Sequence, residues 1–490
     1  MVIGLKNYSI WLDSINKNNY PKLDKNIEVD ILIIGGGITG ISTAYHLINK
    51  GLNVCLVDRN KIGHGISSKT TGKLTILQDL MYTKLSKKHS SSILSQYLNS
   101  QKDAIKLVEE IIRENNIDCD FAKQKSYLFA STKEDVTKVK HEEELLKFMK
   151  VKTNKETLPI NIKNYYAISV DEQAYFHPLK YIYGLAKACS NNDIKIYENT
   201  KVTKLAKKDD LFFCYVDKYI IKAKKVVLAC HYPFFVIPFL FPLKGHLERS
   251  YISASKVNEV KCVSGINTSK SSISFRYHTD NLNNYFLYLN NSHNLAFKFN
   301  LKNNFNKLLN NIEALNFKPE YIWSNIDIIT NDYLPYIGLI KENLYIGTGY
   351  NTWGMTNGSI AGKLLSDLIL NKNNKYKKLF DPKRSSSSIC SITTDIFSSA
   401  KPFIQNKLIK NKPYYAKNVI FTKRNGKSVA IYKDENGIEH IVYNKCPHLK
   451  CSLIFNEIEK TWDCPCHASR FTIDGEVIEG PSNYNIKFKD

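Results

Sequence analysis

The first strong pattern of hydrophobic and polar positions lies between Asp30 and Asp58. An apolar run, Ile31 to Ile34, leads into a glycine-rich turn, then a segment with helical periodicity, then a second apolar run that ends at Asp58. This order predicts a strand, a turn, a helix and a second strand. The segment is therefore expected to form a dinucleotide-binding βαβ unit, the core of an α/β Rossmann-like domain.

The glycines of this turn have the spacing G-x-G-x-x-G. Gly35 permits the tight turn, Gly37 lets the backbone approach a pyrophosphate, and Gly40 lets the helix pack closely on the strand. Asp58, at the end of the second strand, is expected to bind the ribose hydroxyls. A glycine-rich turn alone is a weak signal, but here the strand, the helix and the acidic residue all agree with it.

Weaker patterns divide the rest of the chain. Helical periodicity occurs in 104–115 and 142–149, and strand-like runs occur at 285–289 (YFLYL) and 295–300 (LAFKFN). Short alternating runs between Val419 and Tyr443 are typical of a small antiparallel β domain. We therefore expect three parts: an oxidoreductase in 1–382, a linker in 383–413 and a β domain in 414–490. Within the oxidoreductase, the cofactor-binding segments are expected at about 28–90, 165–240 and 325–372. The substrate domain is expected at about 91–164 and 241–324.

Composition argues against two classes of function for this chain: nucleic-acid binding and membrane spanning. The 490 residues carry a net charge of +23, but the lysines are spread along the chain, so nucleic-acid binding is not expected. No signal peptide is recognisable, and the longest apolar stretch, Tyr232 to Leu243, is too short to span a bilayer. We therefore expect a soluble, cytoplasmic protein with no transmembrane segment. Peripheral membrane contact, or docking of the basic run Lys372 to Arg384 to an acidic redox partner, stays open.

Four residues near the C-terminus have the spacing of metal ligands: Cys446, His448, Cys464 and His467. They form C-x-H and then C-x-x-H, within CPHLKC and CPCHASRF. These loops resemble the ligand loops of the Rieske family, in which two thiolates hold one iron of a [2Fe-2S] cluster and two imidazoles hold the other. Tetrahedral zinc is the alternative for the same four residues, but a zinc site would not need the second cysteine pair.

The Rieske resemblance implies further roles. Cys451 and Cys466 stand where the respiratory members of the family carry a disulfide, and Ser469 stands where a hydroxyl reaches a cluster sulfur. Phe471 replaces a tyrosine of high-potential members, which predicts a lower potential than theirs. Lys450 and Ala468 replace glycines, and we expect both to keep ordinary backbone conformations.

Two segments decide between FAD and NAD. Gly63 to Thr75 (GHGISSKTTGKLT) and Tyr345 to Leu370 (YIGTGYNTWGMTNGSIAGKLLSDLIL) resemble the flavin-covering loop and the closing strand, loop and helix of the D-amino-acid oxidase/glycine oxidase (DAO) family of FAD-dependent oxidoreductases, most closely its amine-oxidising members. The resemblance implies a glutathione-reductase-like, DAO-type FAD-binding fold with an α+β substrate domain, followed by an all-β Rieske domain. It also implies FAD-binding roles for Ser67, Ser68, Lys69, Thr70, Thr71, Gly72, Val202, Gly349, Trp353, Gly354, Met355 and Thr356.

The helix after Gly349 should present its N-terminus to the N1–O2 edge of the flavin. Because no second G-x-G-x-x-G occurs, a separate nicotinamide domain is not expected. No histidine or cysteine stands at a covalent attachment point of the family, which predicts dissociable FAD. Candidate catalytic residues are His177, His246, Arg249 and Arg276, the last with His278 beside it, and for any single histidine a structural role is the commoner one.

These features predict a flavin dehydrogenase. Its substrate is expected to be an amine or amino acid, and its electrons to pass one at a time through the [2Fe-2S] cluster to an unidentified external acceptor. A non-catalytic electron shuttle or redox sensor, whose flavin a protein partner reduces, is the alternative. Rieske oxygenation is rejected because no H-x-x-x-x-H pair is present to hold a mononuclear iron.

Overall fold

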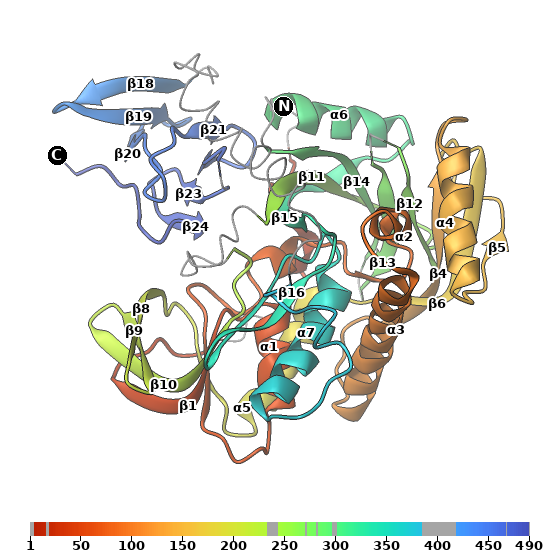
Figure 1. Cartoon of the computed structure of the whole chain (residues 1–490). Helices are drawn as coiled ribbons and strands as arrows, with labels where there is room; N and C mark the ends of the chain where they lie inside the picture. The colour runs from red at the N-terminus through yellow and green to blue at the C-terminus, as the bar shows by residue number, and fades with distance from the viewer. Residues whose placement is uncertain are drawn as a thin grey trace. The chain divides into compact units, whose positions relative to one another are not determined.

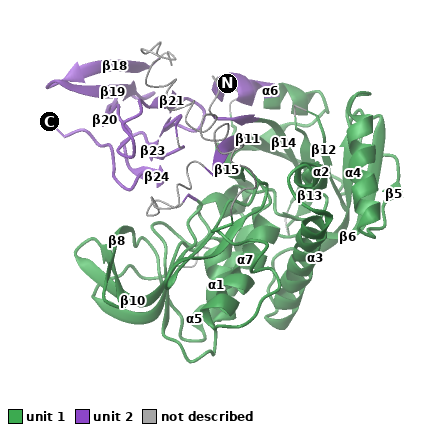
Figure 2. Ribbon diagram, viewed as in Figure 1, with its two compact units in different colours: residues 1–231, 250–292, 308–385 green, residues 232–249, 293–307, 386–490 purple. Residues whose placement is uncertain are grey.

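The computed structural model describes residues 4–15, 19–232, 244–269, 272–280, 283–295, 301–384, 418–466 and 468–489. The chain divides into two compact units (Figure 2). Unit 1 contains residues 1–231, 250–292 and 308–385, and unit 2 contains residues 232–249, 293–307 and 386–490. Unit 2 therefore joins two short internal segments to the C-terminal domain.

The first sheet of unit 1 is mainly parallel. Its strand order is β16 (Tyr336–Lys341), β17 (Leu344–Thr348), β10 (Tyr219–Leu228), β1 (Ile27–Ile34), β2 (Val54–Val57) and β7 (Lys195–Tyr197), and β9 (Leu211–Val216) pairs with both β10 and β8 (Val202–Lys208). From β17 to β7 all neighbours are parallel, whereas β16 is antiparallel to β17. The predicted βαβ unit is thus β1, α1 (Ile38–His46) and β2.

Helices α5 (Pro178–Ser190) and α7 (Gly354–Ile369) pack on α1, and α7 also packs on β16 and β17 of this sheet. Helix α3 (Ser91–Glu114) packs on α7 (Figure 1). Two glycines let α7 cross α1 at short distance. A Cβ atom on Gly358 would lie 2.5 Å from Ile38, and one on Gly362 would lie 2.3 Å from the Ser42 hydroxyl. Because Ile38 is the first residue of α1, the first turns of α1 and α7 lie next to each other.

The second sheet holds the expected substrate domain. Its order is β15 (Pro319–Thr330), β11 (Gly245–Lys256), β14 (Asn284–Asn294), β13 (Ser274–Thr279), β12 (Val263–Asn267), β4 (Ala122–Ala130), β6 (Tyr166–Tyr175) and β3 (Lys73–Leu74), with β5 (Asn154–Lys155) on β6. Strand β6, which falls in the expected cofactor-binding segment 165–240, belongs to this sheet. Short helices complete the described elements of this part: η1 (Ile10–Leu12), η2 (Ile66–Lys69), α2 (Met81–Ser86), α4 (Val136–Phe148) and α6 (Leu301–Glu313).

The helical patterns at 104–115 and 142–149 fall in α3 and α4, which both begin earlier than expected. The YFLYL run is part of β14, whereas residues 296–300 of LAFKFN lie outside the described residues. Most of the expected linker also lies outside them. Its first described residues are fixed: Arg384 pairs with Asp332 (Nε to Oδ2, 2.7 Å) and lies over the ring of Tyr336.

The C-terminal domain has two small antiparallel sheets. One is β18 (Val419–Arg424), β19 (Lys427–Lys433) and β20 (Glu439–Tyr443); the other is β21 (Ile454–Asn456), β22 (Thr461–Asp463), β23 (Arg470–Thr472) and β24 (Val477–Glu479). Their shared core includes Tyr432, Phe455, Trp462 and Phe471. The predicted all-β domain is confirmed.

Within the described ranges, no helix combines the length and the apolar character that crossing a bilayer would require.

Candidate cofactor sites

The glycine turn has the geometry that its spacing predicts. Gly35 has φ +110°, and a Cβ atom there would lie 2.7 Å from the carbonyl oxygen of Ala229. Gly37 is the N-cap residue of α1, and a Cβ atom on Gly40 would lie 1.8 Å from the carbonyl oxygen of Gly35. The turn therefore brings bare backbone to the N-terminus of α1, where a pyrophosphate is stabilised.

Asp58 lies at the end of β2, beside this turn. Its carboxylate accepts hydrogen bonds from the backbone N–H groups of Gly36 (2.8 Å) and Asn60 (2.7 Å). Burial raises the pKa of Asp58, although these two hydrogen bonds oppose the rise. The carboxylate is therefore oriented by the backbone, as expected for a group that binds ribose hydroxyls.

The segment Ser68 to Thr71 follows η2 and has all four carbonyl oxygens bonded to side chains from elsewhere. The Ser68 oxygen accepts from Ser9 Oγ (2.6 Å), that of Lys69 from Trp323 Nε1 (2.9 Å), that of Thr70 from Trp11 Nε1 (2.7 Å), and that of Thr71 from Arg276 Nε. The next residue, Gly72, has φ +72°. The predicted flavin-covering loop is thus fixed through its carbonyl groups. The Ser68 hydroxyl and N–H both donate to the Gly65 oxygen, and the Thr70 hydroxyl accepts from the Gly72 N–H.

Ser67 connects this loop to the nucleotide turn, because its Oγ accepts a hydrogen bond from the Ile38 N–H (3.1 Å). The segment Tyr345 to Leu370 contributes the N-terminus of a second helix, α7. Gly349 has φ +73°, and Trp353 is the N-cap residue of α7, followed by Gly354. The Thr356 hydroxyl donates to the Trp353 carbonyl oxygen (3.3 Å). Met355, the second residue of α7, is buried, and so is Val202, the first residue of β8.

Lys73 was not among the predicted site residues. Its side chain is buried, its Nζ donates to Ser274 Oγ, and it lies over the Trp353 ring, 5.5 Å from the centroid. Burial, with repulsion from Arg276, lowers the pKa of Lys73 to about 7. No ion pair between Lys73 and a carboxylate occurs in the described part of the chain. The sequence offered one indication that Lys73 belongs to the site: it directly follows Gly72 and begins an apolar stretch.

Two of the four candidate catalytic residues, His177 and Arg276, meet at the Trp11 ring, whose centroid lies 4.8 Å from the His177 ring centroid and 5.3 Å from the Arg276 guanidinium carbon. His177 caps α5, with Nδ1 accepting from the Lys180 N–H (3.2 Å) and Nε2 within 2.9 Å of Ser14 Oγ. Arg276 fixes the flavin-covering loop and stacks on Tyr175, so it acts on the site through that loop. His278 is buried beside Asp120 (3.7 Å).

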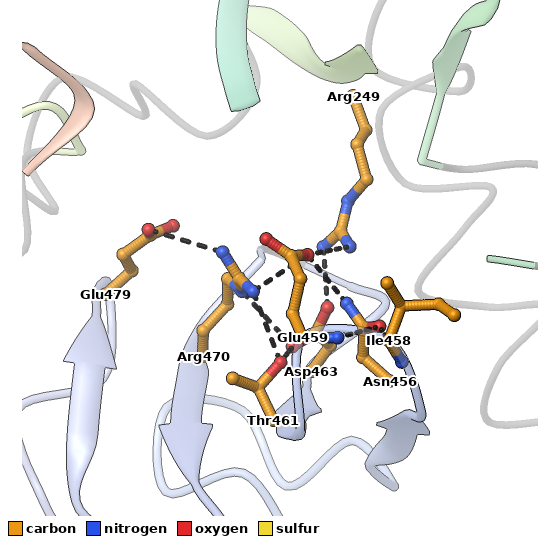
Figure 3. Close-up of polar contacts among 8 residues, drawn as sticks. All are labelled: Arg249, Asn456, Ile458, Glu459, Thr461, Asp463, Arg470 and Glu479. Carbon is orange, nitrogen blue, oxygen red and sulfur yellow. Dashed lines mark hydrogen bonds and ion pairs between the residues drawn. The ribbon is translucent and has the colours of Figure 1, made fainter. Parts of the chain in front are cut away.

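His246 and Arg249 belong to unit 2, unlike the other two candidates. His246 Nε2 lies 3.0 Å from Glu248 Oε1. Arg249 is bonded to Asp463 of the C-terminal domain (2.8 Å). The Nη2 atom of Arg249 is thus bound to a buried carboxylate (Figure 3), whereas its Nε and Nη1 atoms have no hydrogen-bond partner among the described residues. Contact of Arg249 with the substrate or the flavin stays a prediction.

The two predicted ligand loops of the C-terminal domain have the same backbone hydrogen bonds. In the first, the Cys446 N–H donates to the Cys451 oxygen (2.8 Å) and the Lys450 N–H to the Cys446 oxygen (2.8 Å). In the second, the Cys464 N–H donates to the Ser469 oxygen (2.7 Å) and the Ala468 N–H to the Cys464 oxygen (2.9 Å). Each loop therefore closes on its own cysteine and presents that cysteine at its base.

The expectation for Lys450 and Ala468 is wrong. Both adopt the left-handed conformation, with φ of 62° and 59°. Each stands at the fifth position of its loop, where the closing hydrogen bond requires the turn, so the loop geometry is kept without glycine. The cost is local backbone strain, which is larger for these residues than for glycine.

The donor set fits an iron–sulfur cluster. The sulfur atoms of Cys451, Cys464 and Cys466 lie within 4.8 Å of one another, and Cys451 is joined to Cys466 by a disulfide, as the resemblance implies. Hydrogen bonding from Cys464, from backbone N–H groups and from Ser469 lowers the pKa of Cys446 to about 7. The two predicted thiolate ligands, Cys446 and Cys464, are therefore in hydrogen-bonding contact, and the disulfide lies beside Cys464. His448 is partly buried, and His467 lies outside the described residues.

Comparison with protein families defines the class. The family of FAD dependent oxidoreductases (DAO) matches residues 30–368, and the Rieske [2Fe-2S] domain matches residues 407–488. The chain therefore belongs to the DAO family of FAD dependent oxidoreductases and carries a Rieske domain. Its cofactors are FAD and a Rieske [2Fe-2S] cluster, not zinc.

Among individual relatives, YhfW of Bacillus subtilis (strain 168), whose name describes a Rieske 2Fe-2S iron-sulfur protein, is 31% identical over 498 residues, covering 97% of this chain and 96% of YhfW. Gamma-glutamylputrescine oxidoreductase of Escherichia coli (strain K12) is 22% identical over 387 residues, covering 74% and 88%.

Solved structures with the same fold include glycine oxidase from Geobacillus kaustophilus (TM-score 0.61, 17% identity, covering 74% of this chain and 100% of that one). L-amino acid deaminase from Proteus vulgaris is similar too (TM-score 0.59, 18% identity, covering 76% and 100%). At these identities the likeness shows the fold.

Because the Trp11 indole donates to the Thr70 oxygen of the predicted flavin-covering loop, the substitution Trp11→Phe tests this loop. This change removes the indole N–H and leaves the Thr70 carbonyl oxygen buried without that donor, at a cost of about 1–3 kcal/mol. We expect FAD to dissociate about tenfold more readily, measured by the recovery of free-flavin fluorescence. Trp462→Phe is the matched control, because Trp462 also donates to a carbonyl oxygen, that of Ile473, but in the C-terminal domain. Equal FAD affinity in Trp11→Phe and the wild type would contradict this role of the loop.

Ser469 is expected to tune the cluster. Its Oγ accepts from the Ser482 N–H (2.9 Å), which leaves its own proton to donate to the Cys446 sulfur. Ser469→Ala should therefore lower the midpoint potential of the cluster, because hydrogen bonds to sulfur stabilise the reduced state. A redox titration followed by paramagnetic resonance measures the shift. Ser452→Ala, which removes a hydroxyl bonded to Lys445, should leave the potential unchanged, and an unchanged potential in Ser469→Ala would refute the assignment.

Proposed function

We propose that this chain is a flavin-dependent dehydrogenase that oxidises an amine or amino acid and passes the electrons, one at a time, through its Rieske domain to an external acceptor. The observation that carries the proposal is the presence in one chain of an FAD dependent oxidoreductase part and a Rieske [2Fe-2S] domain, whose cofactors differ in electron capacity. The flavin takes up a hydride equivalent from the substrate, and the cluster exchanges single electrons.

The substrate class is supported by the names of the relatives. Gamma-glutamylputrescine oxidoreductase, glycine oxidase and L-amino acid deaminase are all named for substrates that contain an amine. A second G-x-G-x-x-G is missing from the sequence, which supports reduction of the flavin by a small substrate.

The residues of this chain hold the flavin in position and accept the proton of the substrate amine. The bonded carbonyl groups of Ser68 to Thr71 hold the flavin-covering loop, and the N-terminus of α7 offers a positive end to negative charge on the reduced flavin. An amine must lose its proton before it gives up a hydride. Lys73, buried beside Trp353 and mostly uncharged above pH 7, can accept that proton.

A survey of reductants tests the proposal. The holoprotein is mixed anaerobically with a panel of amines and amino acids, and flavin and cluster absorbance are followed. The flavin should be reduced first and the cluster second by at least one compound, and reoxidation by oxygen should be slow. A flavin that responds to none of them would favour the electron shuttle, and a cluster that stays oxidised would refute the relay.

Lys73→Met tests the proton acceptor. Because the Lys73 pKa is near 7, kcat/KM in the wild type should rise with pH through about 7. The variant should lose this limb and about a hundredfold in kcat/KM.

The stability of the fold distinguishes a proton acceptor at Lys73 from a lysine that only holds the structure. Between about pH 7 and 10.5 the unfolded lysine binds a proton that the folded one does not, so Lys73 lowers stability most at or below pH 7. The apoprotein of Lys73→Met should therefore melt no lower than the wild type at pH 7. Lys123→Met, at an exposed ion pair with Glu109, is the control for activity. An unchanged pH profile in Lys73→Met would exclude the proton-acceptor role.

A further inference from the structure

A row of three amide side chains runs through the interior of unit 1: Gln78, Gln101 and Asn357. All three are fully buried. Gln78 Nε2 donates to Gln101 Oε1 (2.9 Å), and Gln101 Nε2 donates to Asn357 Oδ1 (2.9 Å). Asn357 Nδ2 then donates to the carbonyl oxygen of Tyr350 (3.3 Å). The three side chains therefore form one continuous hydrogen-bonded set, the amide row, and Gln101 of α3 is its central member.

The amide row connects three segments that are predicted to bind FAD. Gln78 Nε2 also donates to the carbonyl oxygen of Thr75 (2.9 Å), the last residue of the flavin-covering segment Gly63 to Thr75. At the other end, Tyr350 belongs to the loop before α7, and its hydroxyl lies 2.7 Å from Thr39 Oγ1 in the first turn of α1. All of these residues lie in unit 1, so the row joins the three segments within one compact body.

Only one orientation of the amides satisfies the row. Both of its ends are backbone carbonyl oxygens, those of Thr75 and Tyr350, which can only accept a hydrogen bond. The Tyr97 hydroxyl donates to Gln78 Oε1 (2.7 Å), so the NH2 group of Gln78 is left for Thr75 and Gln101. Turning any one amide around would place two oxygens opposite each other. Because a buried network whose members are all paired specifies a single arrangement, the row fixes how the flavin-covering segment and the loop before α7 lie relative to each other.

Asn357 carries this constraint to the first turn of α7. Trp353 is the N-cap residue, and the Asn357 N–H donates to the Trp353 carbonyl oxygen (3.1 Å) in the first hydrogen bond of the helix. The N–H groups of residues 354–356, which lie between them, have no intrahelical acceptor, because the first turn of a helix provides none. These three residues are among the predicted FAD-binding residues, and their N–H groups form the positive end of the helix. The amide row therefore fixes the direction of this positive end relative to the flavin-covering segment.

We infer that Gln101 is a positioning residue for FAD. Through the amide row it holds the N-terminus of α7 in place relative to the flavin-covering segment, and it thereby sets both the affinity for FAD and the midpoint potential of the flavin. Reduced flavin carries negative charge, so it gains more from the positive end of α7 than oxidised flavin does. The inference rests on the predicted position of FAD at this helix N-terminus, and it is independent of the substrate and of the relay through the Rieske domain.

The first experiment measures FAD affinity. Gln101→Met removes the central amide and keeps roughly the size of the side chain. The change leaves Asn357 Oδ1 and one N–H of Gln78 unpaired in the interior, so the first turn of α7 is no longer held. In the full-length holoprotein we expect FAD to dissociate about tenfold more readily than in the wild type, measured by the recovery of free-flavin fluorescence on dilution.

The second experiment measures the flavin potential, which a purely structural role of Gln101 would leave unchanged. The holoprotein is equilibrated with reference dyes, and the absorbance of the flavin is followed separately from that of the cluster. In Gln101→Met the affinity for reduced FAD should fall about tenfold further than the affinity for oxidised FAD, which lowers the two-electron potential by about 30 mV. Neither experiment uses a substrate or electron passage to the cluster, so failure of the proposed function would leave both results valid.

The matched control is Gln124→Met. Gln124, in β4, is also a buried glutamine whose Nε2 donates to a side chain, but its acceptor is Ser264 Oγ (2.9 Å) in β12 of the second sheet. This variant should keep the FAD affinity and the flavin potential of the wild type. Shifts as large as those of Gln101→Met would show that loss of any buried amide has this effect, and they would overturn the inference.

Tyr97→Phe breaks the same row more mildly, because it removes only the hydroxyl that orients Gln78. It should shift the affinity and the potential in the same direction as Gln101→Met, with an effect of about threefold on FAD dissociation. Wild-type affinity and potential in Gln101→Met, whatever its melting temperature, would overturn the inference. If Gln101→Met does not fold, wild-type values in Tyr97→Phe would overturn it.

Discussion

The four carbonyl oxygens from Ser68 to Thr71 each accept a hydrogen bond from a side chain of another element. Buried peptide groups must be paired, and a cofactor that covered this loop would remove water as a partner. By bonding the carbonyl groups to Ser9, Trp11, Trp323 and Arg276, the chain fixes the orientation of this loop. The second sheet and the N-terminal segment therefore hold the loop that is predicted to cover the flavin, although the dinucleotide turn belongs to the first sheet.

The same requirement shapes the Rieske loops by different means. There the loop backbone bonds to itself, and the two loops repeat one pattern of hydrogen bonds around Cys446 and Cys464. This pattern needs a left-handed residue at the fifth position, and it is kept although Lys450 and Ala468 have side chains. The cluster site is therefore largely local in origin, whereas the flavin site depends on contacts that are distant in sequence.

This difference explains what the sequence could predict. Local spacing was enough for the turn at Gly35, Gly37 and Gly40 and for the two loops that begin at Cys446 and Cys464, because a turn or a loop is built from neighbouring residues. The binding roles of these residues stay predictions. Local spacing was not enough for Trp11 or Lys73, whose roles depend on pairing across a sheet and on burial. The sequence around Arg249 does not show its bond to Asp463 either, because KGHLERSY reads as part of a strand and Asp463 lies 214 residues further along the chain.

Composition contained one further signal. Of the 69 Lys and Arg residues, only seven are arginine, so lysine supplies most of the surface charge. Arginine is the better residue for buried, forked contacts with carboxylates and carbonyl groups, because its planar guanidinium offers several donors and is weakly hydrated. Arg249, Arg276 and Arg470 are nearly fully buried, and Arg384 binds Asp332 with two nitrogens. Four of the seven arginines thus mark positions where a guanidinium fixes the backbone or another charge, whereas Arg113 is exposed and the Arg424 side chain is 39% exposed.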